Sequence, residues 1–392
     1  MTRTADVVVI GGGINGCSIA YHLAKSGAGR VLLVEQRHIA GGPTGRSSGI
    51  VRQHYTLETL ACMARDSLEV FRRFADEVGG SAGFVQTGAM FMASKDNAAT
   101  LEQTVAMHQR LGIRTSVLSA EELGKREELL YHQDLACGAY EPDSGYADPA
   151  LAANSYCEAA KELGVEVLVH TTVTGLQIEN GRIQGVQTDK GDCACSAVVN
   201  VAGPWGAKIA ALAGADIPIL PSRHPVVLMQ RPPQWRNPTP VWLDLVNGAY
   251  FKPEGRAGML IGSIRPEEGE LRAELETFSQ TPSYEEVAGF SETIMKRFPV
   301  MNEGLVQGGW AGLYDVTPDW QPVIDVIPDV QGFYCAVGFS GHGFKLAPAV
   351  GRILAELILE GICRSYDIRM FRYERFQEGR LSPGKYRYSI IG

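Results

Sequence analysis

Short apolar runs and one stretch of helical periodicity alternate in the N-terminal part of the chain. Residues 7–10 read Val-Val-Val-Ile, a glycine-rich turn follows at residues 11–16, and a helical pattern then continues through Lys25. A second apolar run at residues 30–34 ends at Glu35. The order of strand, glycine turn, helix and strand predicts the beginning of a dinucleotide-binding α/β domain.

Similar patterns recur much later in the sequence. Residues 164–173 and 197–205 each predict a strand, and residues 177–186 between them predict a hairpin that turns at Asn-Gly. Residues 332–339 predict another strand, which leads into an amphipathic helix that runs through Ile358. Strands are therefore expected in both the middle and the last part of the chain.

Composition narrows the class of protein. A chain of 392 residues is long enough for two domains. The net charge of -8 argues against a nucleic-acid partner, because phosphate binding needs a clustered cationic face. No apolar run is long enough to span a membrane, and residues 7–10 are too few for a signal-peptide core, so we expect a cytoplasmic protein.

The cysteines do not indicate a metal site. Eight of them are scattered along the chain, and we expect them to be reduced. Cys193 and Cys195 are separated by one residue and have no partner pair at zinc-ligand spacing, so the sequence predicts no metal.

The glycine-rich turn has the spacing of a dinucleotide-binding loop. Gly11 permits a tight turn, Gly13 lets a pyrophosphate approach the backbone, and Gly16 lets the helix pack close to the strand. The phosphates would lie at the N-terminus of the helix, where free N–H groups and the helix dipole attract negative charge. Glu35 follows Gly16 by 19 residues and is placed to accept hydrogen bonds from a ribose diol.

These motifs resemble the D-amino-acid oxidase superfamily of flavoenzymes, and within it the sarcosine oxidase, glycine oxidase and dimethylglycine dehydrogenase branch. The likeness covers nearly the whole chain, and its most specific parts are the N-terminal loop, residues 312–319 and residues 339–345. The polar, glycine-rich loop at residues 40–52 stands where an NAD-binding domain would continue into another crossover helix. FAD is therefore the expected cofactor, and a plain NAD dehydrogenase is the weakest alternative.

The resemblance also implies an architecture. We expect an α/β protein with a Rossmann-like FAD-binding domain and an inserted substrate domain that contains a mixed or antiparallel β-sheet. The resemblance implies that the FAD-binding domain is discontinuous and that the substrate domain is inserted into it. The FAD-binding domain is expected at residues 1–85, 145–215 and 325–375, and the substrate domain at residues 86–144 and 216–324. Residues 376–392 are expected to form a C-terminal tail on the surface or on a partner.

The FAD-binding residues implied by the resemblance come from several of these segments. They are Gly11, Gly13, Ile14, Asn15, Gly16, Glu35, Gln36, Arg46, Ser47, Ser48, Gly49, Val173, Ala202, Gly203, Trp205, Gly312, Gly341, His342, Gly343, Phe344 and Lys345. Monomeric sarcosine oxidases attach FAD through a cysteine at the position of Gly312, so we expect the FAD of this chain to be non-covalent. Residues 140–148 offer no counterpart of the histidine-linked FMN of heterotetrameric β subunits.

Arg52 and Lys345 align with residues that bind the substrate carboxylate in this family. Arginine offers a planar fork that matches a carboxylate, and lysine adds a compact charge. The helix that follows Lys345, with Pro348 expected near its first turn, would direct its N-terminus toward the flavin. His342 lies in the same motif and is a further catalytic candidate.

Two strands of the expected substrate domain supply the remaining candidates. Only one of Tyr250 and Phe251 can face the flavin, because neighbouring side chains in a strand point to opposite faces. Leu260 occupies the position at which sarcosine oxidases hold the lysine that activates oxygen, which puts direct use of O2 in doubt. Electrons would otherwise pass to a quinone, an electron-transfer protein or a partner subunit.

The resemblance implies oxidation of a primary or secondary amine in an amino-acid-derived small molecule. Hydride transfer to flavin N5 would give an imine that water hydrolyses. Sarcosine-like, glycine-like, proline-like and opine-like substrates all fit. A flavin dehydrogenase of 2-hydroxy acids remains open. Also open are a catalytic β-type subunit that needs partner subunits to carry electrons away, and a homo-oligomer.

Overall fold

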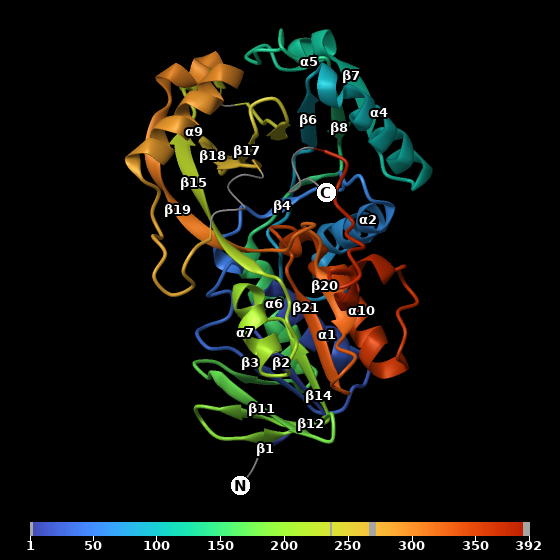
Figure 1. Cartoon of the computed structure of the whole chain (residues 1–392). Coiled ribbons are helices and arrows are strands. Elements are labelled where there is room, and N and C mark those ends of the chain that lie inside the picture. Colours follow the sequence, from blue (N-terminus) through green and yellow to red (C-terminus); the bar gives the residue numbers. More distant parts are fainter. Residues whose placement is uncertain (1–2, 236, 266–271, 387–392) are drawn as a thin grey trace.

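The computed structural model describes residues 3–235, 237–265 and 272–386 of the chain. Two sheets dominate it, a six-stranded sheet in the lower half of Figure 1 and an eight-stranded sheet in the upper half. The N-terminus lies at the bottom, and the described C-terminal end lies near the junction of the two halves. None of the described helices is long and apolar enough to cross a bilayer.

The six-stranded sheet is built from segments that are far apart in the sequence. Its first five strands are parallel, and the sixth is antiparallel to its neighbour. The predicted strands at residues 7–10, 30–34, 164–173, 197–205 and 332–339 all belong to it. In spatial order the strands are β10 (Glu166–Leu168), β3 (Val31–Val34), β2 (Val7–Ile10), β14 (Ala197–Asn200), β21 (Phe333–Val337) and β20 (Val323–Val326).

Alternating side chains of β2 pack on two different layers. Val7 and Val9 belong to the cluster that faces the helices, whereas Val8 and Ile10 face a second, four-stranded sheet. Burial on both faces explains why the strand is apolar without alternation. The helices are α1 (Ile14–Lys25), α2 (Glu58–Arg72), α3 (Phe74–Glu77), α6 (Pro149–Glu162) and α10 (Gly343–Glu360).

The four-stranded sheet covers the other face, together with the short helix α7 (Gly206–Ala211). Its hairpin turns at Asn180 and Gly181, with φ of 51° and 70°, as the Asn-Gly pair predicts for a type I′ turn. In spatial order its strands are β1 (Arg3–Thr4), β13 (Cys193–Ala194), β12 (Arg182–Thr188) and β11 (Val173–Glu179).

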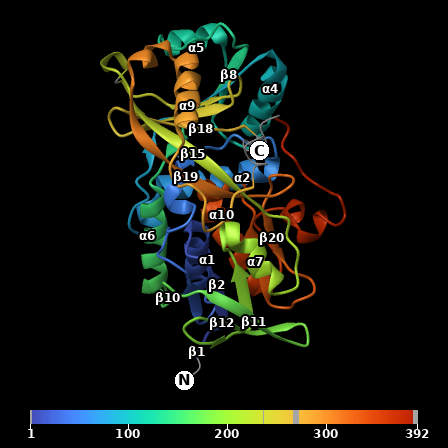
Figure 2. The same ribbon diagram turned by 60° about the vertical axis from the view of Figure 1, so that its left-hand side comes forward.

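The eight-stranded sheet also separates two cores. Helix α4 (Lys95–Arg110) packs on one face, and α5 (Ala120–Arg126) with α9 (Tyr284–Arg297) packs on the other (Figure 2). All neighbouring strands are antiparallel except β16 and β6. The strands are β19 (Leu305–Val316), β15 (Leu220–Gln230), β18 (Gly258–Ser263), β17 (Ala249–Glu254), β16 (Val241–Asp244), β6 (Ala89–Ala93), β8 (Cys137–Glu141) and β7 (Ser116–Ser119).

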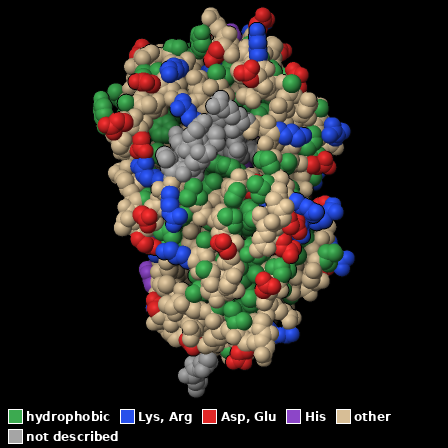
Figure 3. Space-filling model, in the orientation of Figure 1, with side chains coloured by type: hydrophobic (Ala, Val, Ile, Leu, Met, Phe, Trp, Pro, Cys, Tyr) green, Lys and Arg blue, Asp and Glu red, His purple; other side chains and the backbone are tan. Residues whose placement is uncertain are grey.

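A small fourth sheet, of three strands, lies between the two halves. It pairs β4 (Ile50–Val51) and β5 (Val85–Gln86) with β9 (Gly145–Tyr146). The long strands β15 and β19 also descend from the upper sheet toward the lower one in both ribbon views. Acidic and basic side chains are interspersed over the face shown in Figure 3.

One expectation about the C-terminal part needs correction. Pro348 lies inside α10 rather than near its first turn, because the helix already begins at Gly343. In the described part of the tail, residues 377–381 are exposed, and buried residues lie on both sides of this stretch. Arg375 is buried against Asp319, with Nε 2.8 Å from Oδ2, and Tyr386 is buried as well.

The fold yields a stability prediction at Arg297, whose guanidinium joins β16 to the segment after α5. Its Nε lies 2.7 Å from Asp244 Oδ2 and its Nη1 lies 2.7 Å from Asp134 Oδ1, and the side chains of Arg297 and Asp244 are both fully buried. The change Arg297→Met leaves Asp244 as a buried charge without its cation. We expect the free energy of unfolding to fall by about 3–5 kcal/mol.

Denaturant titration of the FAD-loaded protein measures this change. The matched control is Arg364→Met, since the ion pair of Arg364 with Glu360 is exposed and its loss is expected to leave the unfolding midpoint unchanged. Equal midpoints for the two variants would contradict the prediction.

Candidate active site

A cavity of about 520 Å³ lies at the carboxyl ends of the parallel strands, between the two large sheets. Crevices at this edge are where α/β sheets bind ligands, and the volume lies in the usual range for small-molecule sites. Its lining comes from the β2–α1 turn, the segment after β3, the loop at residues 42–52, the ends of β11 and β14, strands β15, β17 and β19, and the start of α10.

The glycine turn forms one end of the cavity. Gly11 has φ of +121°, and a Cβ there would lie 2.5 Å from the carbonyl oxygen of Val201, so only glycine fits. A Cβ on Gly16 would overlap the carbonyl oxygen of Gly11, which confirms the close packing of helix on strand. Gly13 lines the cavity directly. The turn therefore presents backbone to a ligand, as its spacing predicts.

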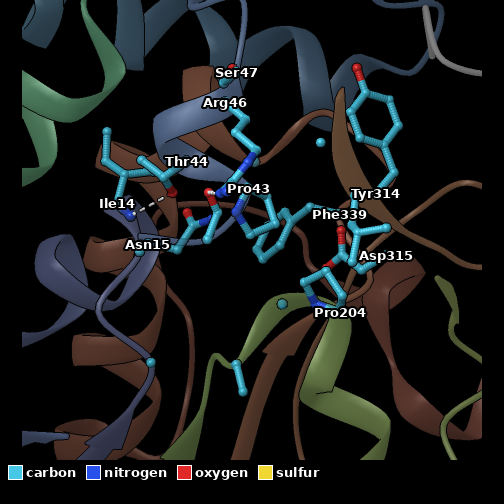
Figure 4. A pocket seen from close by; sticks show the side chains of 18 of the residues that line it. Ile14, Asn15, Pro43, Thr44, Arg46, Ser47, Pro204, Tyr314, Asp315 and Phe339 are labelled. Carbon is cyan, nitrogen blue, oxygen red and sulfur yellow. Dashed lines mark hydrogen bonds between the residues drawn. The ribbon is translucent and has the colours of Figure 1, made fainter. Parts of the chain in front are cut away.

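The first turn of α1 places two polar groups at this end of the cavity. The N–H of Ile14 donates to Thr44 Oγ1 at 3.1 Å, a bond that Figure 4 shows at the left of the cavity. Asn15 also lines the cavity, and its buried Oδ1 has no hydrogen-bond partner among the described residues. Thr44 was not among the predicted residues, since only the fold brings it to the N-terminus of α1.

Glu35 is held at the same end of the cavity. Its Oε2 accepts from the N–H of Gly12 at 2.6 Å, and its Oε1 accepts from the N–H of Arg37 at 2.8 Å. These two bonds fix the carboxylate, and each oxygen keeps a lone pair for a ribose hydroxyl. Glu35 and Gln36 both line the cavity, as expected.

The middle of the cavity runs between the loop at residues 42–52 and the end of β14. Arg46 reaches into it in Figure 4, and its Nη1 donates to the carbonyl oxygen of Gly41 at 3.0 Å. On the opposite side, Trp205 Nε1 donates to Glu276 Oε1 at 2.7 Å. The predicted residues that line this part are Arg46, Ser47, Ser48, Val173, Ala202, Gly203 and Trp205.

Gly312 and its cross-strand neighbour His224 line the next stretch. The two residues are paired between β19 and β15, and the imidazole of His224 stacks on Tyr314 at 3.8 Å between ring centroids. Burial, and then the charge of Arg223, lowers the pKa of His224 to about 3, so the ring is neutral. Sequence reasoning missed His224, because only the register of the two strands places it beside Gly312.

Arg52 and Lys345 line the same end of the cavity, although they are 293 positions apart. Both are buried, with 4% and 6% of their surface exposed. Both also lie over the ring of Tyr55, at 4.6 Å for the Arg52 guanidinium carbon and 5.9 Å for Lys345 Nζ. Burial, and then the charge of Arg52, lowers the pKa of Lys345 well below its ordinary value.

His342 lies behind this pair. Its Nδ1 is 3.3 Å from the hydroxyl of Tyr55, and it is not among the described residues that line the cavity. Burial, and then the charge of Lys345, lowers the pKa of His342 well below its ordinary value, so the ring is neutral. The geometry makes it a support for Tyr55.

Gly49 is also structural, since its φ is +68° and a Cβ would overlap the carbonyl oxygen of Ala147. The rest of the α10 motif, Gly341, Gly343 and Phe344, lines the cavity.

Besides His342, two other predicted catalytic residues do not line the cavity. Strand alternation sends Tyr250 into the cavity lining and Phe251 into the opposite core, where it packs on Phe298. Leu260 is fully buried in the core of β18, opposite Lys252 in β17. Because Leu260 is a core residue, its identity does not support an inference about oxygen.

The cavity fits FAD in its donor set. It offers a backbone cradle and a fixed carboxylate at one end and two buried cations at the other, with Asn15 Oδ1 left for a ligand to satisfy. We next compared the chain with known proteins.

The model of the DAO family, described as FAD dependent oxidoreductase, matches residues 6–357. FAD-dependent oxidoreductase domain-containing protein 1 of Bos taurus is 30% identical, over 96% of this chain and 85% of that protein. Mitochondrial sarcosine dehydrogenase of Mus musculus is 29% identical over 95% of this chain, but the chain spans only 42% of that longer protein.

Solved structures agree with this match. L-proline dehydrogenase from P. horikoshii superposes with a TM-score of 0.89 at 33% identity, and the alignment covers 97% of this chain and 100% of the other. The expected D-amino-acid oxidase type of fold and the expected cofactor, FAD, are both confirmed. This chain belongs to the DAO family of FAD-dependent oxidoreductases.

Proposed function

We propose that this enzyme oxidises a small amine that carries a carboxylate, with sarcosine-like and proline-like amino acids as the leading substrate class. The main support is that Arg52 and Lys345 are buried together at one end of the cavity. Two cations at this depth favour an anionic ligand group, and the planar guanidinium suits a carboxylate. The likeness to a sarcosine dehydrogenase and an L-proline dehydrogenase supports the same class.

The reaction removes two electrons from the carbon next to nitrogen. The substrate loses the hydrogen and the electron pair of this C–H bond to FAD, and its nitrogen loses a proton, which leaves an imine for water to hydrolyse. The chain itself binds the carboxylate through Arg52 and Lys345. Their positive charges also disfavour a protonated amine nearby, because like charges repel at short range in a buried site.

The roles of the cavity residues follow from position. Tyr55 contacts both cations through its ring, and its hydroxyl contacts His342. Tyr250 and Tyr314 supply aromatic walls from β17 and β19. These walls exclude water from the reacting carbon, while the cations fix the orientation of the substrate.

The deciding experiment mixes the enzyme anaerobically with a panel of amino acids, N-methyl amino acids, proline and 2-hydroxy acids and follows bleaching of the flavin absorbance. We expect bleaching by at least one carboxylate-bearing amine. Reduction by hydroxy acids alone would overturn the proposal in favour of the 2-hydroxy acid alternative.

The first prediction concerns the attachment of FAD. Position 312 is glycine, and no cysteine is among the described residues that line the cavity. We therefore expect acid or heat denaturation to release all of the flavin as intact FAD into the supernatant, as measured by chromatography of the supernatant. Flavin that stayed with the precipitated protein would contradict this, and it would direct attention to His224.

The second prediction concerns the carboxylate clamp. Arg52→Ala and Lys345→Met should each raise the KM of the substrate at least about tenfold, which corresponds to about 1.4 kcal/mol of lost binding. Steady-state kinetics with free acid and methyl ester provides the measurement. The ester should be a poor substrate for the wild-type enzyme, and equal rates for acid and ester would show that no clamp exists.

The third prediction is a pH dependence from Lys345. Its pKa is lowered below the ordinary 10.5, so the ammonium is charged at low pH and loses its charge as the pH rises through the lowered value. The Kd of a simple carboxylate such as acetate, followed by flavin absorbance, should therefore increase with pH below 10.5. In Lys345→Met this dependence should disappear, and a wild-type profile as flat as that of the variant would refute the assignment.

A further inference from the structure

Three polar side chains converge on one point outside the cofactor cavity. His54 follows β4, His108 lies on α4, and Glu141 ends β8, and the side chains of all three are fully buried. Glu141 Oε1 lies 3.7 Å from His54 Nδ1 and 3.8 Å from His108 Nδ1, and all three atoms lie within 4.8 Å of one another. None of these three atoms has a hydrogen-bond partner among the described residues.

The second polar atom of each of the three side chains already has a hydrogen-bond partner. His108 Nε2 lies 2.9 Å from the carbonyl oxygen of Tyr55, to which its N–H donates, and His54 Nε2 lies 2.8 Å from the hydroxyl of Tyr386. Glu141 Oε2 accepts from the N–H of Gln53 at 3.0 Å and from Ser144 Oγ at 2.7 Å. These bonds leave the lone pair of His108 Nδ1 and a free Glu141 oxygen directed at the common point.

The charge states agree with this arrangement. Burial lowers the pKa of His54 to about 4 and also lowers the pKa of His108, so both rings are neutral near pH 7. Burial acts to raise the pKa of Glu141, but its interactions with His54 and His108 and the hydrogen bond from the N–H of Gln53 outweigh burial and hold that pKa below its ordinary value. A buried carboxylate therefore faces two neutral imidazoles.

We propose that His54, His108 and Glu141 bind one divalent transition-metal ion, with zinc as the preferred ion. Two imidazole nitrogens and a carboxylate oxygen are a ligand set that zinc accepts. The bonds on the far side of the ligands match the outer contacts that orient metal ligands in proteins.

The distances allow such an ion after a small closure. Zinc–ligand bonds of about 2.0–2.1 Å in a tetrahedral site place ligand atoms about 3.3 Å apart. The two separations from Glu141 Oε1, 3.7 and 3.8 Å, are a few tenths of an ångström wider, and the two histidine nitrogens lie within 4.8 Å of each other. The same ion would neutralise a carboxylate that is otherwise buried without a full counter-charge.

The ion would not contact the substrate, but would hold a neighbouring segment of the chain in place. None of its three ligands is among the residues that line the cavity. However, the carbonyl oxygen of His54 accepts a hydrogen bond from Arg52 Nη1, and that of Tyr55 accepts from His108. The ion therefore fixes the segment that carries Arg52 and Tyr55. The effect of the ion on substrate affinity rests on the proposed function. Binding of the ion itself does not depend on that function.

The test measures zinc in untagged, FAD-loaded protein. The protein is treated with a chelator, dialysed against zinc and desalted, and zinc and flavin are then quantified by mass spectrometry and absorbance. We expect one zinc per flavin in the wild-type chain. His108→Gln and Glu141→Gln should each weaken zinc affinity at least about tenfold. Zinc that is absent from the reloaded wild-type protein would overturn the proposal.

The matched control is His22→Gln. His22 is another largely buried histidine, on α1, and it lies outside the three-residue cluster, so this variant should retain zinc like the wild type. Equal loss of zinc in the control and in His108→Gln would overturn the assignment to this cluster. Flavin absorbance confirms that each variant is folded, and zinc content is independent of any substrate, so the proposed function can fail while this site stands.

Cobalt provides a readout that needs no variant. Cobalt(II) bound by two imidazoles and a carboxylate gives visible bands at wavelengths longer than the flavin absorption. We expect these bands at one cobalt per chain in the chelator-treated wild type, together with a higher thermal midpoint after zinc is added. No bands and no shift in the midpoint would overturn the proposal even if every variant failed to fold.

Discussion

Close backbone packing at the glycine turn is the constraint on which the cofactor cavity depends. The carbonyl oxygen of Val201, at the end of β14, approaches Gly11 so closely that no Cβ fits between them. Gly16 allows α1 the same closeness to the turn. A Cβ on Gly343 would lie 2.8 Å from Asn15 Nδ2, so the start of α10 lies directly beside the start of α1. Two helix N-termini thus meet at one edge of the sheet, where their dipoles favour an anionic cofactor.

Much of this arrangement could be predicted because its signals are local. The apolar run of β2, the glycines after it and the acid at the end of β3 lie within one short segment, and the Asn-Gly pair specifies its own turn. Arg52 and Lys345 could be named only through the family resemblance. Nothing in the pattern near either residue shows that they share a cavity, although the structure brings them over one tyrosine ring.

What the sequence left open or missed depends on pairing between distant strands. Whether Tyr250 or Phe251 faces the cavity follows from the register of β17 with β16 and β18, and the same register places Leu260 in a core. His224 enters the site because β15 pairs with β19 at Gly312. The register of such strands is set by packing across the whole sheet. The local sequence of an apolar strand does not show which of its two faces points into the cavity. The anchoring of Tyr386 similarly depends on a contact with His54 far from it in sequence.

The short segment from Arg52 to Tyr55 links the two charged regions of the molecule. On one side Arg52 adds positive charge to the cavity, and on the other side His54 faces the buried Glu141. A negative charge on Glu141 opposes the positive field of Arg52, because charges are screened weakly in a low-dielectric interior. A dication on His54, His108 and Glu141 would remove that opposition, so the cavity would become more favourable for a carboxylate and less favourable for an ammonium group. The proposed metal site would then act in the same direction as the role that we propose for Arg52 and Lys345.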